Sequence, residues 1–120
     1  MIPIYSDYNI IVAFQKSDGS LYNIDTELLD VFIYAIDDTT GAILAKFSKR
    51  AKNGFTLLAK TDVNYYYCDV ESSLTANLAG RRLRIESKGV VVDNSLTDKL
   101  RDLIVIGYSD YFETNLVGIL

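Results

Sequence analysis

The sequence predicts an all-β sandwich of about seven to eight strands with one to three short helices. Two observations predict this fold class. The apolar runs are short and numerous, and they are rich in the Ile, Val, Tyr and Phe that fit a half-buried pleated surface. The stretches between them carry the Asp, Asn, Ser and Gly that tight turns require. At 120 residues, 49% of them hydrophobic, the chain has the size and composition of a single domain, 1–120.

Eight apolar segments follow one another along the chain, each with the usual length of a strand. They lie at 8–15, 31–36, 42–48, 55–60, 63–70, 83–92, 103–108 and 116–120. Turn residues separate several of them, in KSDGS at 16–20, DDTTG at 37–41 and KNG at 52–54. We expect DDTTG to be a hairpin turn and the strands to be mostly antiparallel, because short connections join antiparallel neighbours.

Three further segments predict short helices: 24–30, 72–80 and 95–103. The second begins with a serine cap and ends at Gly80, where a left-handed residue would stop a helix. In the third, Ser95 stands three residues before Asp98, and three leucines share one helical face. Helices this short cannot form a layer, so we expect them to cover the ends of the sandwich or to bridge its sheets.

The stretch NYYYCDV at 64–70 places three tyrosines beside the only cysteine. Alternate residues of a strand face opposite sides, so the predicted buried face is Tyr66, Cys68 and Val70, and the predicted outer face is Tyr65, Tyr67 and Asp69. We expect Cys68 to be a small buried apolar residue. The sequence places no group beside it that would lower the pKa of a catalytic thiol.

Composition argues against several classes of function. The chain has no histidine, which removes the usual general base and the commonest metal ligand, and it lacks nucleotide, zinc and hydrolase motifs. We therefore expect no enzyme activity, no cofactor and no metal. A net charge of −4 argues against a nucleic acid partner. The first residues match neither a signal peptide nor a membrane span, and one cysteine forms no internal disulfide.

A small hydrolase built on two carboxylates remains an alternative, ranked last. A glycosidase needs two acids facing each other across a cleft, and the candidates are Asp7, Asp69, Glu71, Asp110 and Glu113. Most of them flank turns or strand ends, where carboxylates are common. The acidic turns also lack the spacing of a calcium loop.

Two basic clusters occur, KFSKRAK at 46–52 and RRLR at 81–84. The first runs into a turn and is expected to be a solvated loop. In the second, Arg82 and Arg84 alternate with apolar residues and are expected to point outward from a strand. The alternative for RRLR is a contact between subunits with YSDYFE at 108–113, because Arg pairs with carboxylates and stacks on tyrosine rings.

The segments LTANLAGRRLRIES at 74–87 and VVVDNSLTDKLRDLIVIGYSDYFETNLVGIL at 90–120 resemble the small β-sandwich virion proteins of tailed bacteriophages. The similarity is to head-fibre, decoration and fibre-anchoring modules in phages of gut Bacteroides, including the crAss-like group. It covers about half of the chain and is one of pattern. The resemblance implies an immunoglobulin-like sandwich that serves as an assembly part, with no catalytic residues to carry over.

The predicted function is a non-enzymatic structural component of a phage virion, a head-fibre, decoration or tail adaptor subunit. Expected partners are other virion proteins of the capsid or tail and further copies of the chain, without nucleic acid or membrane. The expected location is the virion, after synthesis in the cytoplasm of the bacterial host. The predicted interface residues are Tyr65, Tyr67, Arg82, Arg84, Tyr108, Tyr111 and Phe112.

The alternative function is a carbohydrate-binding module that stacks sugars on exposed tyrosines, Tyr65 and Tyr67 above all. A separate expectation concerns the apolar segment 116–120. As a terminal strand it would form an edge that its own sheet or a neighbouring chain must cover.

Overall fold

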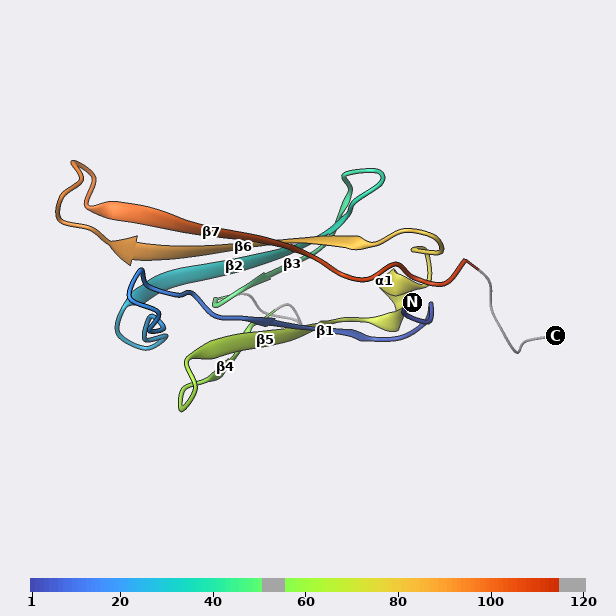
Figure 1. The fold of residues 1–120 in the computed structure, drawn as a ribbon, viewed down its shortest axis with the longest axis horizontal. Coiled ribbons are helices and arrows are strands. Elements are labelled where there is room, and N and C mark those ends of the chain that lie inside the picture. Colours follow the sequence, from blue (N-terminus) through green and yellow to red (C-terminus); the bar gives the residue numbers. More distant parts are fainter. Residues whose placement is uncertain (51–55, 115–120) are drawn as a thin grey trace.

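Two antiparallel sheets face each other in the computed structural model, which describes residues 1–50 and 56–114 (Figure 1). One sheet has the order β1–β5–β4, with β1 at Tyr8–Val12, β4 at Leu58–Lys60 and β5 at Tyr65–Val70. The other has the order β3–β2–β6–β7, with β2 at Leu28–Asp37, β3 at Ile43–Ser48, β6 at Leu83–Val92 and β7 at Leu100–Tyr108. The predicted all-β sandwich is confirmed at this level.

Each of these strands falls on a predicted segment, although the ends differ. The largest differences are of three residues: β2 and β7 begin three residues earlier than predicted, β4 begins three later, and β1 ends three earlier. The predicted segment at 116–120 and the KNG turn at 52–54 lie outside the described residues. The DDTTG hairpin is confirmed, since the Asp37 N–H donates to the Ala42 carbonyl at 2.9 Å and Gly41 has a φ of 76°.

The predicted helix at 24–30 is wrong. The Asn23 side chain accepts the backbone N–H groups of Asp25 and Thr26, each at 2.9 Å, and so forms a turn. Leu28 then begins β2, where Leu28 and Val31 lie buried in the core. The leucines of this segment fit a strand as well as a helix, and tertiary packing selects the strand.

The predicted helix at 95–103 is also wrong. Asp93 accepts the backbone N–H of Ser95 at 3.0 Å and its hydroxyl at 2.6 Å, and Lys99 has a positive φ of 60° that ends the turn. β7 starts at Leu100 and pairs with β6 along its whole length. The helix predicted at 72–80 forms only as α1, Ser72–Thr75, and Gly80 adopts its positive φ of 74° beyond the helix end.

The core lies between the inner faces of the two sheets. In β5 the prediction for NYYYCDV is confirmed, because the buried side is Tyr66, Cys68 and Val70. The Tyr66 hydroxyl donates to the Ile24 carbonyl at 3.2 Å, so its polar end has a partner inside the core. The four-stranded sheet contributes mainly β-branched, small and aromatic residues, namely Val31, Ile33, Ala35, Ala45, Phe47, Leu83 and Val91.

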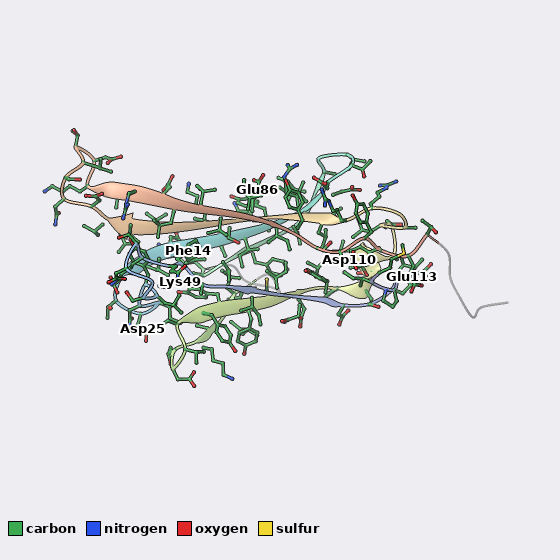
Figure 2. All side chains as sticks on the ribbon, viewed as in Figure 1. Phe14, Asp25, Lys49, Glu86, Asp110 and Glu113 are labelled. Atoms are coloured by element: carbon green, nitrogen blue, oxygen red, sulfur yellow. The ribbon has the colours of Figure 1, made fainter. Side chains whose placement is uncertain are left out.

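Gly89 gives the core room for an aromatic ring. It lies in β6 opposite Val31 of β2, and the buried ring of Phe14 packs over it. Phe14 is labelled in Figure 2. A Cβ atom at position 89 would lie 3.2 Å from two ring carbons of Phe14 and 3.3 Å from a Leu28 methyl. The strand is therefore interrupted by glycine because a side chain at that point would collide with the core.

We expect Gly89→Ala to lower the free energy of unfolding by about 1–2 kcal/mol through overpacking against Phe14. The matched control is Gly107→Ala on β7, where a Cβ atom would meet nothing within 4 Å and φ is not positive. That variant should be neutral or stabilising by about 0.5 kcal/mol. Urea denaturation of both measures the difference, and equal effects would contradict this account of Gly89.

Candidate interaction surfaces

The outer face of the three-stranded sheet carries the tyrosines predicted to be exposed. Tyr65 and Tyr67 are half-buried, and their rings meet edge to face with centroids 6.2 Å apart. Together with Asn9, Ile11 and Lys60 they line a hollow of about 290 Å³. The strand register explains the grouping, because Ile11 and Tyr67 are direct neighbours on β1 and β5, and Lys60 lies opposite Tyr65.

Polar groups border this hollow, which we call the tyrosine face. The Asn9 amide donates to the Asp69 carboxylate at 2.8 Å, across the β1–β5 pair. Lys60 adds an exposed ammonium group. Aromatic rings beside amide and ammonium groups form a surface that a polar ring compound could bind. Sequence reasoning missed Asn9 and Ile11 because their position depends on pairing between the distant strands β1 and β5, and it missed Lys60 because the register of the β4–β5 hairpin was not assigned.

A second surface lies where the DDTTG turn meets RRLR. Arg81 Nη1 contacts Asp37 Oδ2 at 2.7 Å, and Arg82 Nε contacts Asp38 Oδ2 at 3.0 Å. Arg84 reaches Asp38 at 3.5 Å and Glu86 at 3.0 Å. The predicted interface arginines are thus paired with acids of the same chain. Sequence reasoning identified Asp37 and Asp38 only as turn residues and missed this pairing.

The Arg82 guanidinium also stacks on two tyrosines, with its carbon 4.4 Å from the ring centre of Tyr108 and 5.2 Å from that of Tyr111. The contact between RRLR and YSDYFE, expected as an alternative between subunits, therefore exists within one chain. Tyr108 and Tyr111 still keep about half of their surface exposed, at 51% and 47%. Both remain accessible to a partner.

Phe112 requires a correction. It is fully buried, and its ring packs edge to face on Tyr8 with centroids 6.3 Å apart. Its backbone N–H donates to the Arg81 carbonyl at 2.8 Å, and it bridges Ile2 on one side and Ala79 on the other. Phe112 is therefore a core residue at the end of the sandwich and offers no surface to a partner.

A third surface, the β7 edge, was not predicted. β7 is the outermost strand of its sheet, and β6 is its only paired strand among the described residues. It runs along the outside of the upper layer in Figure 1. Its exposed apolar side chains are Leu100, Ile104, Val105, Ile106 and Tyr108. The sequence indicated a strand here, but its place at an edge depends on the topology of the whole sheet.

The candidate carboxylates do not form one site. Asp7, Asp69 and Glu71 line a hollow of about 250 Å³, and neither Asp110 nor Glu113 is part of its lining. Asp7 accepts the backbone N–H of Ser72 at 2.8 Å, at the start of α1. Asp110 and Glu113 lie near each other at one end of the molecule (Figure 2).

Asp110 has the wrong electrostatics for a general acid. The hydrogen bond from the Tyr111 N–H and the nearby terminal ammonium, 3.1 Å from Asp110 Oδ2, lower the pKa of Asp110. A general acid needs a raised pKa so that it holds a proton at neutral pH. Within residues 1–50 and 56–114, no three His, Cys, Asp or Glu side chains are placed to hold a metal ion.

Cys68 is buried, and burial, followed by the nearby Asp69 charge, raises the pKa of its thiol to about 12. The thiol is protonated at neutral pH, and a nucleophilic cysteine needs the opposite shift. We expect native protein at pH 8 to react with iodoacetamide about 10³-fold more slowly than a Val105→Cys variant, whose added thiol is exposed. Rapid labelling of native Cys68, followed by mass spectrometry, would contradict the buried, protonated thiol.

Asp37 links the hairpin to RRLR and makes stability depend on pH. Burial acts to raise the pKa of Asp37, but hydrogen bonds from Arg81 and from the Thr39 and Thr40 amides outweigh burial and lower it. A lowered pKa in the folded state stabilises the fold above the unfolded-state value, near pH 4. This stabilisation is lost as the pH falls from there through the folded-state pKa.

We expect Asp37→Asn to lower the free energy of unfolding at pH 7 by roughly 1–2 kcal/mol, because the Arg81 contact loses its charge. The difference from wild type should shrink as the pH falls below about 4, where the wild-type carboxylate takes up a proton. Denaturation curves at several pH values test this. A difference that stays constant down to pH 2 would show that the charge of Asp37 is not the cause.

No helix in the described part of the chain has the length and apolar character needed to cross a bilayer. Comparison of the chain with protein-family models gives no match, and comparisons with curated proteins and with solved structures give none either.

Proposed function

We propose that the chain is a non-enzymatic assembly subunit that associates with protein partners through the β7 edge. The observation that carries the proposal is a long edge strand, β7, that has no charged residue from Leu103 to Tyr108. An open edge presents unpaired N–H and C=O groups that template pairing with another chain, and proteins usually blunt such edges with charge, short length or cover.

The other edges in the described residues carry this protection. β1 has five residues and β4 only three, ending in Lys60. β3 has Lys46 within it, with its ammonium over the rings of Phe32 and Tyr34 at 5.4 and 5.6 Å. β7 has nine residues, and no charge interrupts it from Leu103 to Tyr108. An edge of this kind favours association by strand addition.

The proposed setting is a phage virion, where the chain would be a head-fibre, decoration or tail adaptor subunit bound to capsid or tail proteins. The segments that resemble phage virion modules include β6 and β7. The strand order supports an immunoglobulin-like assignment, with β1, β4 and β5 as strands B, D and E and with β2, β3, β6 and β7 as C, C′, F and G.

A carbohydrate-binding module is the second candidate, and the tyrosine face favours it. Tyr65 and Tyr67 would supply stacking surface, while Lys60 would donate hydrogen bonds to hydroxyl groups. Here binding needs only one copy of the chain, whereas an assembly subunit acts through contacts between chains.

We expect the purified chain to associate as its concentration rises from micromolar to millimolar, and Ile106→Glu to weaken that association because it adds a charge to the β7 edge. Light scattering coupled to size exclusion measures the mass. The control is Tyr67→Ala on the tyrosine face, which should leave the association unchanged. A monomer at every concentration that binds glycans and loses them on Tyr67→Ala would contradict the assembly function and favour the second candidate.

A further inference from the structure

We propose that β7 pairs with β7 of a second copy, antiparallel and around a two-fold axis at Ile104, so that two four-stranded sheets become one continuous sheet. This inference rests on the proposed function, and it names the partner of the β7 edge and the register of the contact. Backbone directions, side-chain rows and charge positions carry it.

Backbone hydrogen bonds define which groups of β7 point outward. Beyond one end of the β6–β7 pair, the Ser109 N–H donates to the Leu83 carbonyl at 2.9 Å, and beyond the other the Asp93 N–H donates to the Lys99 carbonyl at 2.9 Å. Hydrogen-bonded and non-hydrogen-bonded pairs alternate in an antiparallel ladder. The odd-numbered residues of β7 therefore bond to β6, and the even-numbered residues direct their N–H and C=O groups toward the open edge.

A second β7 strand satisfies these groups when Ile104 lies opposite Ile104 of the second copy. Ile104 is the centre of the strand Leu100–Tyr108, so this register pairs all nine residues and brings even-numbered residues opposite even-numbered ones. A register shifted by one residue in either copy would place bonding groups opposite non-bonding ones. A shift by two keeps the bonding pattern but leaves strand ends unpaired.

The side-chain rows of this register are compatible on both sides of the sheet. On the outer side, Leu100 lies opposite Tyr108 of the second copy, and the two Ile104 side chains meet at the axis. On the inner side, Leu103 lies opposite Val105 of the second copy. Apolar cross-strand pairs of this kind stabilise a sheet. No like charges face each other.

The two charged residues of β7 lie near its start and already have partners in one copy. Arg101 contacts Asp93 at 3.5 Å and donates to the Tyr22 hydroxyl at 3.0 Å. Asp102 contacts Lys88 at 3.3 Å. In the paired register they lie opposite Gly107 and Ile106 of the second copy, away from the axis. Both charged residues therefore keep their existing ion pairs when the two β7 strands pair.

Spin labels test the register directly. Leu100→Cys and Tyr108→Cys each place one label in every copy, and buried Cys68 stays unlabelled. With the axis at Ile104, the backbone separation is about 27 Å for both positions, because four residues of about 3.4 Å each lie between the labelled position and the axis in each copy. A register shifted by two residues moves the axis to Leu103 or Val105, so that one of the two separations becomes longer and the other shorter. Unequal distances of that kind overturn the proposed register.

A matched pair of charges tests the edge. Ile104 on β7 and Ile43 on β3 are equally exposed, at 59% and 60%, and lie on opposite edges of one sheet. Ile104→Lys places two ammonium groups at the axis and should weaken the dimer at least tenfold, whereas Ile43→Lys should leave it unchanged. If Ile104→Lys folds and still dimerises while Ile43→Lys is monomeric, this inference is overturned. The copies would then associate through the β3 edge. A wild-type chain that never associates overturns the β7–β7 pairing, and glycan binding by that monomer, lost in Tyr67→Ala, overturns the proposed function as well. If Ile104→Lys does not fold, the label distances decide.

Discussion

The four-stranded sheet is one strand wider than the three-stranded sheet that faces it, and much of the molecule follows from this mismatch. The central strands β2 and β6 are covered and hold most of the core of their sheet. The last strand, β7, extends past the cover, so that even Val105, on its inner side, is 45% exposed. A groove of about 180 Å³ runs between β1 and the inner side of β6 and β7. The exposure of the inner side of β7 is thus a consequence of the strand count, and the proposed assembly uses the edge of this strand.

The same architecture separates stability from interaction. The arginines of RRLR hold the hairpin acids and stack on Tyr108 and Tyr111, so they order the end of the four-stranded sheet. Phe112 closes the core at that end. Two of the surfaces that stay open to partners are the tyrosine face on one sheet and the β7 edge on the other. Because these lie on different sheets, one copy could use both without conflict.

The sequence predicted what local patterns decide. Alternation placed Tyr66 and Cys68 in the core, and Asp-rich or Gly-rich stretches located the turns. Prediction from the sequence failed at 24–30 and 95–103. There the leucine spacing fits both helix and strand, and the side chains of Asn23 and Asp93 close turns. The candidate surfaces were harder still to predict. Arg82 meets Tyr108, and Ile11 lies beside Tyr67, only because distant strands pair in a particular register.

Amide hydrogen exchange along β7, followed by NMR at low and high protein concentration, tests most directly whether its edge is open in one copy and paired in the assembly. In the monomer, Leu103 and Val105 should exchange slowly because they bond to β6, while Ile104 and Ile106 exchange fast. As concentration rises, Ile104 and Ile106 should become protected. Equal protection of all four at low concentration, or continued fast exchange of Ile104 and Ile106 in the associated protein, would contradict the account.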